Sequence, residues 1–173
     1  FNNELRLIAS RKVRIFTQMC IEHAPNYFWI IPSSSTGEYH PADENVEGGK
    51  VLHTKRVVNI ANHLCETLLV RGIERDCVIA ASIMHDFCVD GFPNDTGHSV
   101  TGHGYLWNEL VRKAYTKNDI LDDRHFKVIS RLILLHMGKY DAPYYLDYDD
   151  KLACIVHMSD YIASRKNILV DIK

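Results

Sequence analysis

The sequence has 173 residues, a hydrophobic fraction of 46%, a charged fraction of 24% and a formal net charge of −2. These values are typical of one globular domain that buries a core, and the charge excludes an overall basic field for binding long nucleic acid. There is neither an apolar run of about 18 residues to span a membrane nor a basic-then-apolar leader pattern.

The chain starts with a helical pattern and continues in a long loop. Apolar residues recur at helical spacing over residues 3–24, which predicts a helix within residues 1–25. Residues 26–49 are rich in proline, serine and glycine and predict a loop. Since so long a loop is uncommon in a compact domain unless it works at a site, we expect it to border an active site.

Five further helical patterns follow, rich in Leu, Ile, Val and Ala and separated by turns that contain Gly, Pro or Asp. They cover residues 51–70, 74–88, about 100–115, 122–137 and 149–169. No segment alternates with a period of two over the length of a strand. The sequence therefore predicts an all-α fold: a single domain over residues 1–173, with a helical core at 50–170. The five cysteines lie mostly in apolar patterns without metal-binding spacing, which favours small buried side chains in a reducing cytoplasm.

Histidines and aspartates lie in or beside these apolar helical runs. The sequence contains ten histidines. A buried carboxylate is costly unless it is paired or bound to a metal, and imidazole nitrogens with carboxylate oxygens suit iron, manganese, zinc, cobalt or nickel. We therefore predict a site for a divalent transition metal, with six candidate ligands: His53, His85, Asp86, His103, His136 and Asp160.

The order of these residues resembles the H…HD…D signature of the HD-domain superfamily of metal-dependent phosphohydrolases. The resemblance covers roughly residues 28–167 and is strongest to small phage and bacterial HD proteins. It includes Phe28-Trp29, the Pro32 to Gly37 segment, Tyr39-His40-Pro41, Glu47-Gly48-Gly49, His53-Thr54, His136-Met137-Gly138-Lys139 and Asp160-Tyr161-Ile162-Ala163-Ser164-Arg165-Lys166. It implies a helical bundle of the HD-domain type.

The resemblance also implies the roles of the candidate ligands. The first metal would be held by His53, His85, Asp86 and Asp160. The histidines of a second metal match His103 and His136, which favours two metals per chain with Asp86 as the bridging catalytic carboxylate. His98 competes with His103, and the helical pattern that directly follows His103 favours the latter.

One departure from the family pattern concerns positive charge. Many similar proteins carry a lysine three residues after the Asp of the HD pair, and this chain has Val89 there. Arg56, Lys139 and Arg165 are candidates to stabilise phosphoryl charge instead, although each could equally be a solvated surface charge.

The loop offers candidate substrate-binding groups. Hydroxyl groups come from Ser33, Ser34, Ser35 and Thr36, while Tyr39 or Trp29 could stack on a base and His40 could contact phosphate or act as a general acid. Trp29 fits a core position as well, and His157 fits either a ligand-supporting or a core position. We take His23, His63 and His125 as structural or surface residues.

These features predict a metal-dependent phosphohydrolase that cleaves a phosphomonoester or phosphodiester in a nucleotide or short oligonucleotide. The alternatives are a dNTP triphosphohydrolase, a module similar to those of bacterial 3′–5′ exoribonucleases, and a nucleotide-binding module whose catalysis has lapsed. We expect a cytoplasmic protein with a small nucleotide or short oligonucleotide as partner, no membrane and no long nucleic acid. Assembly into a homo-oligomer stays open.

Overall fold

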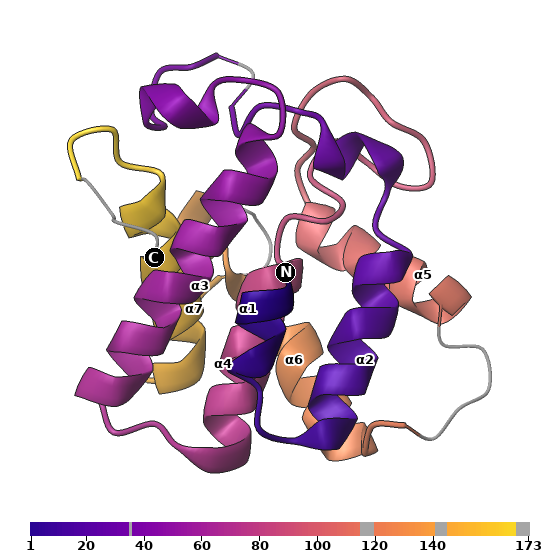
Figure 1. Cartoon of the computed structure of the whole chain (residues 1–173), viewed down its shortest axis with the longest axis vertical. Coiled ribbons are helices and arrows are strands. Elements are labelled where there is room, and N and C mark those ends of the chain that lie inside the picture. The colour runs from indigo at the N-terminus through magenta and orange to yellow at the C-terminus, as the bar shows by residue number, and fades with distance from the viewer. Residues whose placement is uncertain (35, 115–119, 141–144, 169–173) are drawn as a thin grey trace.

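The computed structural model describes residues 1–34, 36–114, 120–140 and 145–168, and every regular element in these ranges is helical (Figure 1). This confirms the predicted all-α fold. The α-helices are α1 (Asn2–Arg6), α2 (Arg11–Glu22), α3 (Gly49–Thr67), α4 (Gly72–Met84), α5 (His103–Ala114), α6 (Asp123–Leu135) and α7 (Lys151–Ala163). The described residues also form three short 3-10 helices, η1 (Asn26–Trp29), η2 (Ala42–Glu44) and η3 (Gly138–Tyr140). None of the described helices has the length and apolar character needed to cross a membrane.

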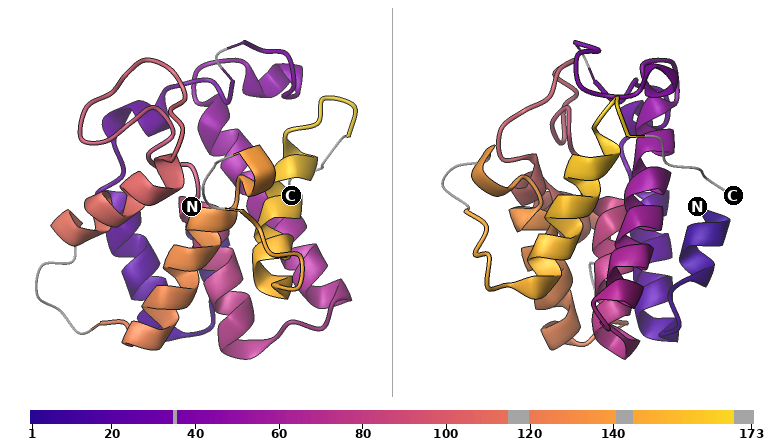
Figure 2. Two further views of the ribbon diagram at one scale, coloured as in Figure 1. Left: turned by 180° about the vertical axis from the view of Figure 1, so that it is seen from behind. Right: turned by 90° about the vertical axis from the view of Figure 1, so that its left-hand side faces the viewer.

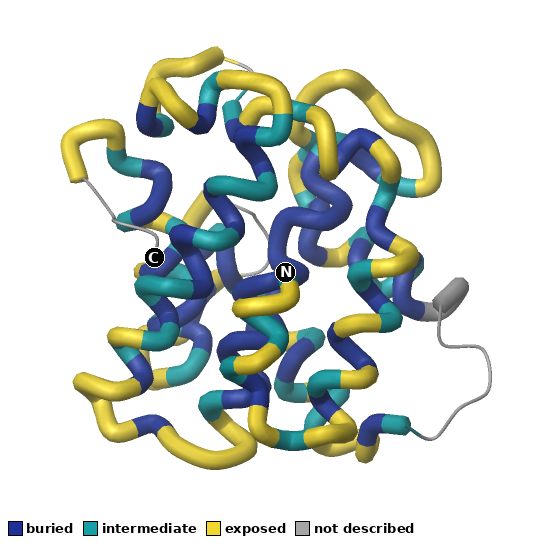
Figure 3. The backbone as a smooth tube through the Cα atoms, viewed as in Figure 1, coloured by how far each residue is buried: buried dark blue, intermediate teal, exposed yellow. Residues whose placement is uncertain are grey.

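Helix α4 is the centre of the bundle. It packs against α1 and α2 on one side and against α6 and α7 on the other, with α3 alongside (Figure 2). Every residue from Asp76 to Met84 is buried, which is characteristic of a helix that is surrounded by others. Burial continues beyond the helix to residue 89, whereas the long loops at the rim are mostly exposed (Figure 3).

The predicted N-terminal helix is in fact two helices, α1 and α2, so the prediction of one continuous helix is wrong. The carboxylate of Asp76 in α4 accepts hydrogen bonds from the backbone N–H groups of Ala9 (3.1 Å) and Ser10 (2.7 Å). The Ser10 hydroxyl accepts from Val13 N–H (3.5 Å) and caps α2. These bonds stabilise a non-helical segment between the two helices.

Helix α2 buries one face against the core. Its buried residues are Val13, Phe16, Thr17 and Cys20, the i, i+3, i+4, i+7 spacing of an amphipathic helix. The Phe16 ring meets the ring of Trp107 in α5 edge-on, with centroids 6.3 Å apart. The same core contains four of the five cysteines, and Cys154 is partly exposed.

Two glycines fix the loop of residues 26–49 against the start of α3. Gly48 adopts a left-handed conformation (φ 76°), which favours glycine, and precedes the helix. A Cβ on Gly49 would lie 1.7 Å from the backbone oxygen of Glu44, so only glycine lets η2 approach this closely. The loop is thereby held beside the end of α3 that carries His53.

Candidate metal centre

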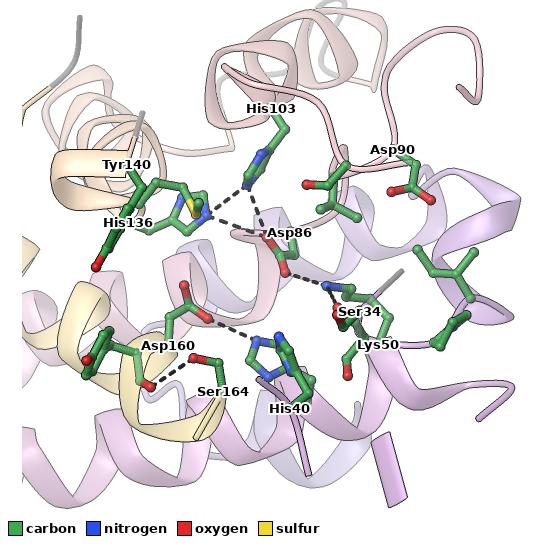
Figure 4. Close-up of a pocket in the computed structure, with 18 of the residues that line it drawn as sticks. Ser34, His40, Lys50, Asp86, Asp90, His103, His136, Tyr140, Asp160 and Ser164 are labelled. Carbon is green, nitrogen blue, oxygen red and sulfur yellow. Dashed lines mark hydrogen bonds and ion pairs between the residues drawn. The ribbon is translucent and has the colours of Figure 1, made fainter. Parts of the chain in front are cut away.

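The six candidate ligands converge at one end of the bundle. All of them except His85 line a cavity of about 530 Å³, and Figure 4 shows Asp86, His103, His136 and Asp160 at its wall. His53 comes from α3 and Asp160 from α7, while His103 begins α5 and His136 follows the end of α6. His85 and Asp86 directly follow Met84, the last residue of α4, and begin a buried turn.

The first group of ligands consists of His53, His85 and Asp160. The Oδ1 atom of Asp160 lies 3.0 Å from His53 Nε2 and 3.8 Å from His85 Nε2. His85 Nε2 also lies 3.5 Å from Oδ2 of Asp86. Two nitrogens and a carboxylate oxygen therefore face one point.

The second group consists of Asp86, His103 and His136. Oδ1 of Asp86 lies 3.2 Å from His103 Nε2 and 3.5 Å from His136 Nε2, and the two nitrogens are 3.0 Å apart. Asp86 thus presents Oδ2 to the first group and Oδ1 to the second. Asp86 therefore lies between the two groups, with one carboxylate oxygen near each.

Backbone carbonyls fix the orientation of three of the imidazoles. In each of these histidines, Nδ1 donates a hydrogen bond to the backbone carbonyl oxygen of the residue three positions earlier. The distances are 2.8 Å for His85, 2.9 Å for His103 and 2.6 Å for His136. The opposite nitrogen, Nε2, is then directed at the ligand groups, as in a metal-binding histidine. The buried Nε2 of His85 has no hydrogen-bond partner among the described residues. A cation would satisfy this nitrogen, so the residues fit a divalent transition metal.

Electrostatics favour charged carboxylates at this site. Burial would raise the pKa of Asp86, but the charges of Lys50 and His85 outweigh burial and hold it well below its usual value. Burial acts on Asp160 in the same way, and hydrogen bonding to His53 holds its pKa low as well. Both carboxylates are therefore ionised, which is the form that binds a metal.

The histidines differ in how readily they lose a proton. Burial lowers the pKa of His136, so this ligand is neutral. Burial also opposes charge on His53, but the hydrogen bond to Asp160 and the nearby carboxylate of Glu44 outweigh it and raise the pKa of His53 to about 9. A metal must therefore displace a proton from His53 at neutral pH.

Glu44 lies beside His53 of the first group, a position that we did not predict. Its carboxylate is fully buried, accepts a hydrogen bond from His40 Nδ1 (2.8 Å) and lies 3.4 Å from His53 Nδ1. Its other oxygen pairs with Arg56. A glutamate in a loop rich in Pro and Gly is usually solvated, so only the fold reveals this role.

Of the three predicted phosphoryl-binding cations, one lines the cavity. Arg165 does so, with its guanidinium 4.2 Å from the centroid of the Tyr161 ring. Arg56 is instead buried in ion pairs with Asp43 and Glu44, and Lys139 is exposed; neither lines the cavity. The prediction that they contact a substrate in this cavity is therefore corrected: Arg56 is held by its ion pairs, and the Nζ atom of Lys139 lies 5.3 Å from the centroid of the Tyr140 ring.

Lys50 is a cavity cation that we did not predict. Its Nζ donates to Asp86 Oδ2 and to the Ser33 carbonyl oxygen, both at 2.9 Å (Figure 4). It precedes His53 by three residues and therefore shares its helix face. This spacing was the available signal. Val89, which stands where similar proteins carry a lysine, lines the same cavity.

The candidate substrate-binding residues of the loop are distributed unevenly. Ser34 and His40 line the cavity; Ser33 lines it too, although its hydroxyl donates to the Glu44 carbonyl (3.1 Å). Thr36 and Tyr39 are exposed and do not line it, and Ser35 lies outside the described residues.

The competing aromatic and histidine candidates are also placed. Trp29 packs its ring against Phe28, with centroids 5.3 Å apart, and does not line the cavity. His98 is exposed and outside the lining, which leaves His103 as the ligand candidate. His157 lines the cavity and donates from Nδ1 to the His136 carbonyl (2.6 Å), so it supports a ligand segment.

Comparison with known families identifies the class of this protein. The HD domain family matches residues 51–165, well over half of the chain, and the chain belongs to this family. The family lies within the superfamily of metal-dependent phosphohydrolases, whose members bind divalent metals at buried His and Asp clusters such as those described above. Searches of curated proteins and of solved structures gave no match to the chain.

Proposed function

We propose that this protein hydrolyses a phosphomonoester or phosphodiester of a nucleotide or short oligonucleotide with two divalent transition metals. The observation that carries the proposal is the position of Asp86. Its two oxygens lie within 3.5 Å of histidine nitrogens from both groups, which supports one metal in each group with Asp86 between them.

The chain supplies positioning and charge for this reaction. When bound, the metals would lower the pKa of water to about 7 and provide the attacking hydroxide. Lys50 and Arg165 face the cavity and can stabilise the negative charge that develops on phosphoryl oxygens. Ser34 adds a hydroxyl group at the same wall.

The charges that line the cavity favour a substrate with a single phosphate group over a triphosphate. Its volume of about 530 Å³ suits a nucleotide, and exposed Tyr140 and Tyr161 in its lining offer ring faces for a base. Asp90 and Asp95 also line it and offset the charges of Lys50 and Arg165. A triphosphate would meet these carboxylates without further cations from the described lining, which disfavours the dNTP triphosphohydrolase.

The non-enzymatic alternative is a binding module. Val89 favours a binding module, because many similar proteins carry a lysine at this position and this chain does not. The complete set of ligands and the presence of Lys50 favour catalysis instead.

An activity screen with metal analysis tests the proposal. The protein would be loaded with Mn²⁺, Fe²⁺, Co²⁺, Ni²⁺ or Zn²⁺ and offered nucleoside mono- and triphosphates, cyclic and linear dinucleotides and short single strands. We expect orthophosphate release or diester cleavage with about two metals per chain. His85→Ala should lose metal and activity, whereas His63→Ala, an exposed histidine of α3, should keep both.

Other results would replace the proposal. Release of intact triphosphate would identify the triphosphohydrolase. Bound metal without turnover of any of these substrates would identify the binding module. A His85→Ala variant that retained full metal content and activity would refute the assignment of the site.

A further inference from the structure

Lys50 stands out because it is a buried cation in direct contact with the shared carboxylate. Its residue exposure is 3%, yet it lines the cavity. Burying a lysine is costly unless its charge is compensated, and the compensation here is Asp86, 2.9 Å away. Burial of the Lys50 ammonium group therefore requires a negative charge beside it.

The ammonium group retains hydrogen-bonding capacity. It has three N–H donors, and two are taken by Asp86 Oδ2 and the Ser33 carbonyl. Among the described residues, no further acceptor lies within hydrogen-bonding distance of Nζ. One donor therefore remains for an acceptor that enters the cavity.

The charge around Lys50 changes when metal binds. Both oxygens of Asp86 face histidine groups that fit a metal, so a metal would take up much of the negative charge that now compensates Lys50. A phosphoryl group restores that charge, because its oxygens accept hydrogen bonds from ammonium groups. The second cavity cation, Arg165, is stacked over Tyr161 at the cavity wall, which leaves Lys50 as the cation that contacts Asp86.

We infer that Lys50 binds a non-bridging phosphoryl oxygen of the substrate and, through the Ser33 carbonyl, holds the loop against that phosphate. Lys50 thereby supplies the positive charge that Val89 does not. This inference rests on the proposed phosphohydrolase function and adds a substrate-binding residue to it.

Binding of inorganic phosphate to the metal-loaded protein tests this role without requiring turnover. We expect Lys50→Met to keep its metal content and to bind phosphate about tenfold to 100-fold more weakly, the effect of losing a charge-assisted hydrogen bond. Lys55→Met is the matched control: Lys55 lies on the same helix outside the cavity lining, so its phosphate affinity should equal that of the wild type. Calorimetry and metal analysis on the same samples give both readouts.

Two further variants separate charge from folding. Lys50→Arg keeps the charge and should bind phosphate within a few-fold of the wild type, whereas Lys50→Gln keeps only hydrogen bonding and should behave as Lys50→Met. If Lys50→Met does not fold, Lys50→Gln takes its place. Unchanged phosphate affinity in the neutral variants, or loss of metal from them, would overturn the inference.

The failure of this inference is distinguishable from failure of the proposed function. A wild type that binds phosphate through Lys50 but cleaves no phosphoester would remove the function and leave the binding role. If the wild type cleaves phosphoesters while the neutral variants bind phosphate normally, the proposed function stands and the binding role of Lys50 is removed. A wild type that binds no phosphate would overturn the role of Lys50.

Discussion

Gly104 in α5 lies directly against the carbonyl oxygen of Ile133 in α6. A Cβ on Gly104 would lie 2.7 Å from that oxygen, so the close approach of the two helices requires glycine. The neighbouring residue, His103, lies 3.0 Å from His136 through this packing, measured between the Nε2 atoms. A small residue thus sets the spacing of the second ligand group.

Gly104→Ala should therefore weaken the second metal group. Alanine favours a helix over glycine by about 1 kcal/mol, so the expected damage comes from the contact with Ile133, where overpacking costs about 1–3 kcal/mol. We expect metal content to fall from about two to about one per chain with the fold intact, as measured by elemental analysis and circular dichroism.

Ser130→Ala is the control for that variant. The Ser130 hydroxyl donates to the Asn108 side chain (2.8 Å) across the same helix pair, but its replacement by alanine adds no bulk. Its metal content should match the wild type. Full metal occupancy in Gly104→Ala would contradict the proposed role of the glycine.

Glu44→Gln should lower affinity for the metal held by His53. The neutral amide cannot supply the negative charge beside His53 Nδ1, and loss of such a supporting carboxylate typically costs about tenfold to 100-fold in metal affinity. Competition with a chromophoric chelator would measure the change. Asp43→Asn provides the comparison, because Asp43 pairs with the same Arg56 but is 59% exposed by its side chain, against 0% for Glu44. Equal metal affinities in the two variants would disprove a specific role of Glu44.

Stabilisation by metal should grow with pH. In the metal-free protein the pKa of His53 is raised from 6.5 to about 9, so its contribution to stability is complete below pH 6.5 and disappears as pH rises through 9. Metal affinity depends on pH in the opposite direction and increases as pH rises, because the ligand nitrogen must lose its proton to bind the metal. The increase in Tm on adding a fixed concentration of metal should thus be larger at pH 8.5 than at about pH 6.5.

Thermal melts with and without Mn²⁺ at several pH values would measure this trend. In His53→Gln the part of the trend that comes from His53 should vanish. A metal-induced shift in Tm that stays constant or shrinks with rising pH in the wild type would contradict a protonated His53 in the metal-free site.

Asp76→Ala should destabilise the fold without changing the metal site. The variant leaves the N–H groups of Ala9 and Ser10 without their buried acceptor, which costs about 2–3 kcal/mol in free energy of unfolding. Glu74→Ala, an exposed carboxylate on the same helix, should change it by less than about 0.5 kcal/mol. Urea titrations measure both; equal stabilities would show that Asp76 does not hold the segment between α1 and α2.

The sequence alone determined the all-α fold and the family of this protein. Helical spacing in segments such as Val13 to Cys20 reports which face is buried, because periodicity is a local property of the chain. The order of His53, His85-Asp86 and Asp160 identified the family, because motif spacing is also read along the chain.

Only the tertiary structure decided which other side chains reach the site. Lys50 and Glu44 enter it, while Arg56 is held in ion pairs with Asp43 and Glu44. The break between α1 and α2 likewise depends on Asp76, more than sixty residues away along the chain. Such contacts join segments that are separated along the chain. The sequence does not show which charges will pair, because pairing depends on how the helices pack and on which charges are buried together.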